Sequence, residues 1–284
     1  MKRLLVQLDS DKLASVFDAI TAYDAGVDHV LSYGGVSPQD VRGLVYGAMF
    51  TRSGNDLKNS ALFIGGSSVP VGEQMLKAAQ DAFFGLVRVS VMADPNGSNT
   101  TAAAAVLKII RATPVTGKRA VIFAGTGPVG VRSALLLAKE GCQVTLTSRR
   151  LDRAQDACRA IRQSSKLDVG PMEVRDDAAA TRALEGKHIV LAAGAAGIEL
   201  VKKDLWTASP SILVVADINA VPPLGVGGIK PTDDAQEREG RLVFGALGIG
   251  GLKMKIHRAA VAKLFEQNDL VLDVEEIYEI GKTL

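Results

Sequence analysis

Three glycines in the segment GTGPVG have the spacing of a phosphate-binding turn. The segment follows an unbroken apolar run, Ala120–Ala124, which predicts a buried parallel strand, and it precedes the helical pattern VRSALLLAKEG. Such a turn needs one glycine for the tight bend, one for the approach of a pyrophosphate and one for close helix–strand packing. The helix N-terminus that follows attracts negative charge. These features predict a dinucleotide site, although a turn that binds nothing is the alternative. The predicted site residues are Gly125, Thr126, Gly127, Pro128, Val129 and Gly130.

Basic residues follow the next predicted strand, at the position that separates NAD from NADP. An acidic residue about 20 residues after the glycines would bind the 2′-hydroxyl of NAD. The chain instead has Ser148, Arg149 and Arg150 there. Guanidinium groups bind a 2′-phosphate through paired N–H donors, so these residues predict NADP. Asp152 lies two residues beyond and could weaken the discrimination, which leaves NAD as the weaker ligand. Two solvated arginines in a loop are the alternative.

Two more loops follow predicted strands of the same sheet. Ligands bind beyond the carboxyl ends of parallel strands, so these loops are candidates for further cofactor contacts. Small residues in the first loop would let the backbone pass the ribose and nicotinamide, and polar residues in the second could donate or accept hydrogen bonds. Ordinary turn chemistry explains each residue about as well. The candidates are Ala193, Gly194 and Ala195 in the first loop and Asp217 and Asn219 in the second.

The composition excludes several classes of protein. The 284 residues are 47% hydrophobic and 23% charged, which is typical of a soluble globular chain and not of a disordered or fibrous one. A net charge of +2 gives no support to a nucleic-acid surface. No run of about 18 uncharged apolar residues is present, so we expect no membrane span, and the N-terminal apolar stretch is too short for a signal peptide.

The histidines and cysteines do not form a recognisable motif. His29, His188 and His257 are far apart and lack metal-ligand spacing, so we expect no metal site. Cys142 and Cys158 cannot form a disulfide framework, which favours a reducing compartment and hence the cytoplasm. No GxSxG or catalytic cysteine signature occurs. The chemistry is therefore expected to come largely from the cofactor, with hydride transfer as the candidate.

Short β-rich runs alternate with helical patterns along nearly the whole chain. This alternation predicts an α/β fold with parallel sheets. We expect a Rossmann-like doubly wound parallel sheet over residues 114–271, preceded by a smaller α/β domain over residues 1–113. The C-terminal helix, residues 272–284, is expected to join the smaller domain. Ser37 and Pro38 predict the start of one helix, and another is expected from about Leu252.

Six segments together resemble the methylotroph-type methylenetetrahydromethanopterin dehydrogenase family. They are VQLDSDKLASVFDAITAYDAGVDHV, DPNGSNTTAAA, GTGPVGVRSA, SRRLDRAQ, VVADINAVPPLGVGGI and FGALGIGGLKMKIHRA, and the similarity extends over almost the full chain. The resemblance implies oxidation of the methylene bridge of a tetrahydropterin to the methenyl form, with a hydride passing to NADP. Some members also accept NAD or methylenetetrahydrofolate. It further implies a cytoplasmic homotrimer with a role in one-carbon metabolism and methylotrophy.

The resemblance also directs attention to residues that could position a pterin. The polar loop DPNGSNTT lies at the expected domain junction, where clefts form, and its side chains could bind the pterin edge. A helix N-cap with a linker is the alternative. Phe17 could stack on the ring, although core packing of a helix face would also explain it. The candidate substrate-binding residues are Phe17, Asp18, Asp94, Asn96, Ser98, Asn99 and Thr100.

Lys253 is the candidate catalytic residue by resemblance. It follows the glycines of GALGIGGLK, next to the expected helix start, and it could orient the pterin or tune the electron density of the reacting nitrogen. A solvated surface lysine is the alternative.

Two other functions remain open. One is another NAD(P)-dependent dehydrogenase on a two-domain α/β scaffold, of the shikimate or bifunctional-folate type. The other is a non-catalytic NADP-binding sensor, although no helix-turn-helix with a basic face is evident. The sequence does not separate tetrahydromethanopterin from tetrahydrofolate as the substrate.

Overall fold

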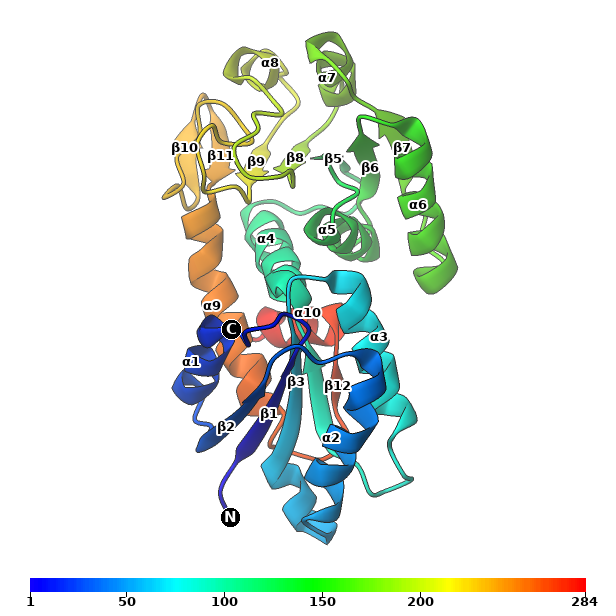
Figure 1. Cartoon of the computed structure of the whole chain (residues 1–284). Helices are drawn as coiled ribbons and strands as arrows, with labels where there is room; N and C mark the ends of the chain where they lie inside the picture. Colours follow the sequence, from blue (N-terminus) through cyan, green and yellow to red (C-terminus); the bar gives the residue numbers. More distant parts are fainter. The chain divides into compact units, whose positions relative to one another are not determined.

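The computed structural model describes residues 1–284 and has the expected α/β fold with parallel sheets (Figure 1). The chain forms two compact units, one of residues 1–100 with 254–284 and one of residues 101–253. These ranges differ from the expected boundaries at 113/114 and 271/272. Both divisions lie inside continuous helices, α4 (Ser98–Ala112) and α9 (Ala246–Lys263). A helix that leaves one unit and enters the other has no turn residues at the boundary, so the sequence pattern does not mark it.

The first unit contains a five-stranded parallel sheet with the order β12-β4-β3-β1-β2. Its central strand, β3, is buried along its whole length, which agrees with the apolar run Ala61–Ile64 that forms most of it. The short β12 was not expected from the sequence and is added at the edge when Val271 pairs with Val91. The strands are β1 (Leu4–Asp9), β2 (His29–Tyr33), β3 (Ser60–Gly65), β4 (Ser90–Ala93) and β12 (Val271–Leu272).

Two helices, α2 and α3, cover one face of this sheet and form its main apolar core. Helix α2 begins as predicted at Ser37 and Pro38, and the Ser37 N–H donates to the Asp40 carboxylate at 2.9 Å. The helices belonging wholly to this unit are α1 (Val16–Asp24), α2 (Pro38–Phe50), α3 (Val69–Asp81) and α10 (Val274–Lys282), with 3₁₀ turns η1 (Gly54–Asn59) and η2 (Pro95–Gly97).

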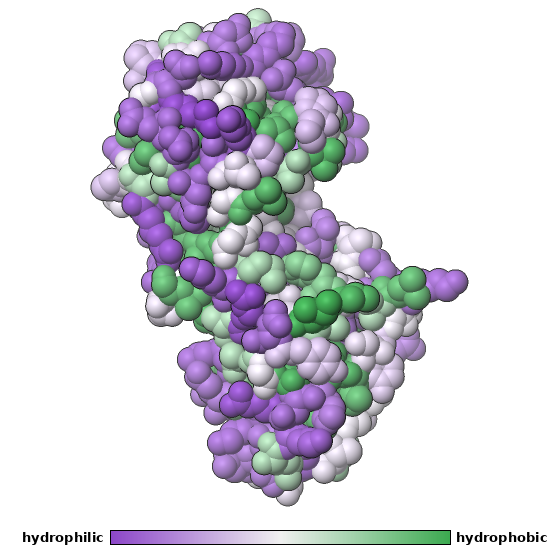
Figure 2. Space-filling view, turned by 90° about the vertical axis from the view of Figure 1, so that its left-hand side faces the viewer, coloured by the Kyte–Doolittle hydropathy of each residue, from purple (hydrophilic) through white to green (hydrophobic).

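Helix α1 and the edge strand β2 leave large apolar side chains exposed. On α1, Val16 is 70% and Ile20 56% exposed, and Tyr23 is also exposed. On β2, Leu31 and Tyr33 are exposed. Figure 2 views the molecule from the left-hand side of Figure 1, and this face carries hydrophobic side chains among hydrophilic ones. Unlike β3, these two elements therefore have an uncovered apolar surface.

The second unit contains a seven-stranded sheet with the order β10-β11-β9-β8-β5-β6-β7. All neighbouring strands are parallel except the hairpin of β10 and β11, which the sequence analysis did not predict. The hairpin turn has Glu239 and Gly240 in the left-handed region, at φ 50° and 72°. The strands are β5 (Arg119–Phe123), β6 (Gln143–Ser148), β7 (Gly170–Glu173), β8 (Ile189–Ala192), β9 (Val214–Asp217), β10 (Gln236–Arg238) and β11 (Arg241–Phe244).

Trp206 belongs to the apolar core of this second unit. It is fully buried, and its indole N–H donates to the carbonyl of Gly227 at 2.9 Å. Cys142 and Cys158 are free and buried, and burial raises the pKa of the Cys142 thiol to about 11. No helix of the chain combines the length and the apolar character needed to cross a bilayer. The remaining helices are α5 (Pro128–Lys139), α6 (Leu151–Ser165), α7 (Asp177–Leu184) and α8 (Lys203–Thr207).

Helix α9 begins six residues earlier than predicted, at Ala246 instead of Leu252. The prediction was wrong because glycines in the segment were interpreted as a turn. A Cβ at Gly245 would collide with the Lys230 carbonyl, and one at Gly248 with the Asp233 carbonyl. These two glycines therefore permit close packing of the helix start against the preceding loop.

We expect truncation of a central core side chain to destabilise the first unit. Leu62 on β3 is fully buried, and Leu62→Ala should lower the free energy of unfolding by about 2–5 kcal/mol because it creates a cavity. Leu86→Ala is the matched control, since Leu86 is 86% exposed. Urea denaturation followed by circular dichroism measures both. Equal small effects would show that β3 is not the centre of this core.

Candidate functional site

The turn after β5 is closely packed against the end of β6. The Gly125 N–H donates to the Thr147 carbonyl at 2.9 Å, and the Ala124 N–H donates to the Thr147 hydroxyl at 3.2 Å. A Cβ at Gly125 would lie 2.9 Å from Leu146 Cγ, and one at Gly130 would collide with the Gly125 backbone. The absence of side chains at these two positions therefore brings the first turn of α5 against the end of β5.

Gly127 differs from the other two glycines because it faces open space. The nearest atom to a Cβ built at Gly127 is the Ala193 carbonyl oxygen, 3.9 Å away. Gly127 is the N-cap residue of α5, with Pro128 and Val129 in the first turn. First-turn N–H groups have no partner inside a helix and are available to an anion. The opening between the loops after β5 and β8 therefore exposes backbone to a phosphate group.

A cavity of about 730 Å³ begins at Thr126, next to Gly127, and extends across the ends of β5, β6, β7 and β8. Its volume is in the range of small-molecule and cofactor sites. Four arginine side chains line the cavity, and Thr126, another lining residue, directly precedes the N-cap of α5. Guanidinium groups next to a helix N-terminus match the chemistry of a phosphorylated nucleotide, so the residues fit NADP. The other predicted turn residues, Gly125, Gly127, Pro128, Val129 and Gly130, do not line the cavity themselves. The sequence-predicted residues that line the cavity are Thr126, Ser148, Arg149, Arg150 and Ala195.

Asp217 and Asn219, two predicted cofactor residues, hold their own loop together. Asp217 is buried, and its carboxylate accepts hydrogen bonds from the N–H groups of Asn219 at 2.9 Å and Val226 at 3.0 Å. Burial raises the pKa of Asp217, and these N–H groups oppose the shift. The Asn219 side chain accepts from Val221 N–H at 3.0 Å. Neither residue lines the cavity, and nearby Gly194 packs against Leu200.

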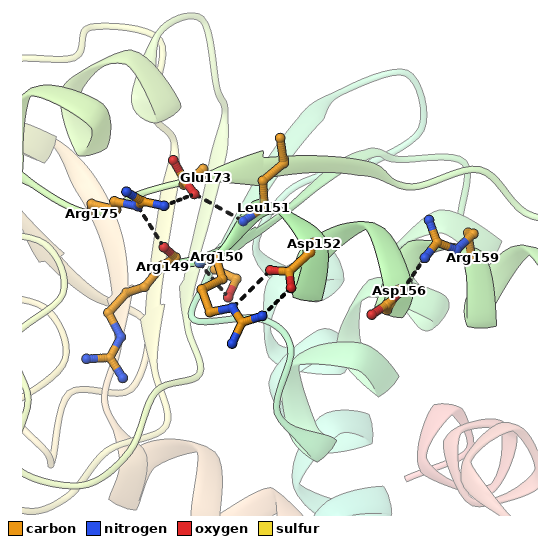
Figure 3. A network of polar contacts seen from close by, with 9 residues as sticks. Arg149, Arg150, Leu151, Asp152, Asp156, Arg159, Glu173 and Arg175 are labelled. Atoms are coloured by element: carbon orange, nitrogen blue, oxygen red, sulfur yellow. Dashed lines mark hydrogen bonds and ion pairs between the residues drawn. The ribbon is translucent and has the colours of Figure 1, made fainter.

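The two arginines predicted to bind the 2′-phosphate differ in their partners. The Arg150 guanidinium makes two contacts with the Asp152 carboxylate, one of them Nε to Oδ1 at 3.0 Å (Figure 3). This pairing holds the pKa of Asp152 below its usual range. The Arg149 guanidinium points away from these residues and makes no such contact. The negative charge of Asp152 therefore reduces the positive charge that Arg150 can offer a phosphate, and it does not contact Arg149.

The cavity also contains residues that the sequence analysis did not select. Among them are Arg153 and Arg175, the carboxylates Asp176, Asp177 and Glu199, and the apolar side chains of Val174, Ile198 and Leu200. Arg153 is the third arginine of SRRLDR, in the first turn of the helix predicted there, and a cation at that position is a signal that could have identified it. No local signal identifies the others, because the sheet order places the ends of β7 and β8 near that of β6.

In the first unit, most of the predicted substrate loop caps helix α4. Asp94 is buried, and its carboxylate accepts from Asn99 N–H at 2.8 Å, from Thr100 N–H at 3.1 Å and from the Thr100 hydroxyl at 2.6 Å. The Ser98 hydroxyl donates to the Pro95 carbonyl at 2.8 Å. Asn96 is different, since it is exposed and left-handed at φ 56°. Within this loop, Asn96 is therefore the side chain that remains accessible to a ligand.

Phe17 and Asp18 lie at the start of α1. The Phe17 ring is 6.2 Å from that of His257, which in turn stacks on Phe63 at 5.5 Å. The Asp18 carboxylate faces the end of β3, since a Cβ at Gly65 would lie 3.3 Å from Asp18 Oδ2. This places an aromatic ring and a carboxylate at the carboxyl-end edge of the first sheet.

Lys253 lies on α9 and is the last residue of the second unit. It is partly buried, whereas the nearby Lys255 is exposed. No group of three or more His, Cys, Asp or Glu side chains is arranged to hold a metal ion.

The different surroundings of the turn glycines lead to opposite expectations. Gly130→Ala should lower stability by about 1–3 kcal/mol because its Cβ would collide with backbone. Gly127→Ala should leave stability unchanged but weaken NADP binding at least about tenfold, because the new methyl group would occupy the phosphate approach. Thermal unfolding and calorimetric titration measure the two effects. A Gly127→Ala variant with unaltered NADP affinity would contradict this assignment.

Comparisons with known proteins identify relatives over the whole chain. The chain is 49% identical over 285 residues to the "Bifunctional protein MdtA" of Methylorubrum extorquens, covering 100% of this chain and 99% of the relative. It is 32% identical to an "NAD(P)-dependent methylenetetrahydromethanopterin dehydrogenase" of the same organism, covering 99% and 98%.

A structural comparison supports the fold. The ligand-free 5-ketofructose reductase of Gluconobacter sp. strain CHM43 has a TM-score of 0.54 and 16% identity, covering 100% of this chain and 99% of that one. Residues 16–96 match the family model for the N-terminal domain of methylene-tetrahydromethanopterin dehydrogenase. The resemblance seen in the sequence is confirmed, and the chain belongs to the methylene-tetrahydromethanopterin dehydrogenase family.

Proposed function

We propose that this protein oxidises methylene-tetrahydromethanopterin, or methylene-tetrahydrofolate, to the methenyl form by hydride transfer to NADP. The observation that carries the proposal is an arginine-edged dinucleotide cavity in a chain of this family. One relative is named as NAD(P)-dependent and as acting on methylenetetrahydromethanopterin. The arginines after β6, in place of a carboxylate, favour NADP over NAD here.

The second unit would hold the cofactor with the loops at the carboxyl ends of its strands. The turn of Gly125–Gly130 would bind the pyrophosphate, and Ser148 with the arginines that follow would bind the adenosine end. Ala193–Ala195 would lie along the ribose, and Asp217 with Asn219 would keep the next loop in place. When bound, NADP supplies the hydride acceptor.

The oxidation needs little acid–base help from the protein. The methylene C–H bond breaks with both electrons leaving as a hydride, and a nitrogen lone pair forms the new C=N bond, so the product is a cation. No proton is transferred in this step. The protein's task is therefore to bind and orient the pterin and to exclude water.

The first unit would supply most of the pterin contacts. Phe17 offers an aromatic face, Asp18 a carboxylate and Asn96 an amide at accessible positions. The loop that presents Asn96 is held by hydrogen bonds, so the residues that make these bonds would support the pterin contacts indirectly. They are Asp94, Ser98, Asn99 and Thr100. Lys253 would donate a hydrogen bond that orients the reacting part of the pterin.

We further propose that the protein is a cytoplasmic homo-oligomer, a homotrimer by family resemblance, with a role in methylotrophic one-carbon metabolism. The exposed apolar side chains of α1 and β2 support association, because contiguous exposed apolar surface is often covered by a partner. The two buried, free cysteines are consistent with a reducing compartment.

Steady-state kinetics with both pterins and both nucleotides tests the proposed function. We expect reduced cofactor to form with methylene-tetrahydromethanopterin or methylene-tetrahydrofolate, with a higher kcat/KM for NADP than for NAD. Absorbance of the reduced nicotinamide measures the rate. NADP binding without turnover on either pterin would favour the sensor, and turnover of a hydroxy acid instead would favour a shikimate-type enzyme.

Lys253→Ala should lower kcat about 100-fold or more while leaving the NADP dissociation constant unchanged, because a lost orienting contact acts at the reacting centre. Lys255→Ala is the matched control, since Lys255 is exposed on the same helix. Turnover and calorimetric titration separate the two effects. Near-normal turnover of the Lys253 variant would refute its role.

A further inference from the structure

Four arginines line the cavity of the second unit, and their partners divide them into two pairs. Arg150 is paired with Asp152, and Arg175 is paired with a carboxylate at the end of β7. Arg149 and Arg153 make no side-chain hydrogen bond or ion pair, and both are exposed. The uncompensated positive charge at the cavity edge is therefore on Arg149 and Arg153.

Arg175 and its partner Glu173 hold the segment at the start of α6, next to Arg149. Arg175 donates from Nε to the Arg149 carbonyl at 3.1 Å, and its other end donates to Glu173 at 2.8 Å. The same Glu173 oxygen accepts from the Leu151 N–H at 3.1 Å, at the first residue of α6 (Figure 3). Glu173 and Arg175 thus join the end of β7 to the start of α6 and fix the backbone at Arg149.

Arg149 and Arg153 are suitably placed for one dianion. Arg149 directly follows β6, and Arg153 lies in the first turn of α6. The positive end of the helix dipole is at the same place. Ser148 also lines the cavity, and its hydroxyl oxygen accepts from the Arg150 N–H at 3.3 Å, so its O–H remains able to donate.

The opposite side of the cavity is unsuitable for a phosphate. Its lining includes three carboxylates, Asp176, Asp177 and Glu199. Asp176 caps α7 by accepting from Ala179 N–H at 2.7 Å, and Asp177 pairs with Lys202. Lys202 offsets the charge of Asp177, but the carboxylates of Asp176 and Glu199 have no ion-pair partner. These two negative charges repel a dianion, so a phosphate is favoured on the α6 side.

We propose that Arg153 is a further NADP-specificity residue, which together with Arg149 forms the clamp for the 2′-phosphate. Arg150 and Arg175 act instead as positioning residues, through Asp152 and Glu173. The inference rests on the proposed NADP dependence, and it changes the predicted pair from Arg149 with Arg150 to Arg149 with Arg153. The apolar side chains of Val174, Ile198 and Leu200 would then lie along the adenine.

Calorimetric titration of the full chain tests this assignment without any pterin. The ligands are NADP, NAD, 2′,5′-ADP and 5′-AMP. Arg153→Ala should weaken NADP and 2′,5′-ADP binding about 10- to 100-fold, because charge-assisted hydrogen bonds to the phosphate are lost. Binding of NAD and 5′-AMP should change by less than about twofold, because neither carries the 2′-phosphate. Arg153→Lys should restore part of the loss, since it retains the charge without the paired donors.

Arg159→Ala is the matched control. Arg159 is an exposed arginine on the same helix, it pairs with Asp156, and it does not line the cavity. Its NADP affinity should equal that of the wild type.

The outcomes separate the inference from the proposed function. A wild-type protein that binds NADP more tightly than NAD, with no loss in Arg153→Ala, would overturn the inference and leave the proposed function intact. The inference would also fail if Arg150→Ala lost more NADP affinity than Arg153→Ala, or if Arg153→Ala weakened NADP and NAD equally. A wild-type protein that binds neither nucleotide would overturn both.

Discussion

The dinucleotide cavity depends on a close backbone approach that any side chain at Gly125 or Gly130 would prevent. Gly125 lies against Leu146 and the end of β5, and Gly130 lies against the Gly125 backbone. This contact places the N-terminus of α5 at the carboxyl end of its sheet. The first-turn N–H groups of the helix then face the same opening as the loop after β8. Without this contact, the helix N-terminus at Gly127 would not be placed to bind a phosphate.

Charge pairing decides which side chains at that opening remain available to a ligand. Arginines 150 and 175 are each matched by a carboxylate, so their guanidinium groups stabilise the loops between β6, β7 and α6. Arginines 149 and 153 lack such a match and carry the local positive charge. The four arginines therefore do not act as one binding element. The two paired arginines maintain the local backbone, and the two unpaired ones remain available to bind a ligand.

The first unit shows the same division between support and contact. Asp94 accepts three hydrogen bonds from the start of α4, which makes the loop before that helix rigid, and Asn96 is presented at its exposed bend.

The alternation of apolar and helical segments was sufficient to predict both sheets as parallel α/β layers. It missed the hairpin of β10 and β11 and the short β12, because strands of two to four residues are too short to show a clear period.

The sequence by itself determined the fold class, the phosphate-binding turn and the family, because each rests on local pattern or on similarity along the chain. The tertiary structure alone decided the partners of each charged side chain. Glu173 and Arg175 are more than twenty residues beyond Arg149, and the β6–β7 pairing brings them together. The tertiary structure also showed that α4 and α9 each run from one unit into the other. The sequence could not show this, because a continuous helix has no stop signal where the units divide. Spacing along a chain predicts neighbours within one element, whereas contacts between elements depend on strand order and helix packing.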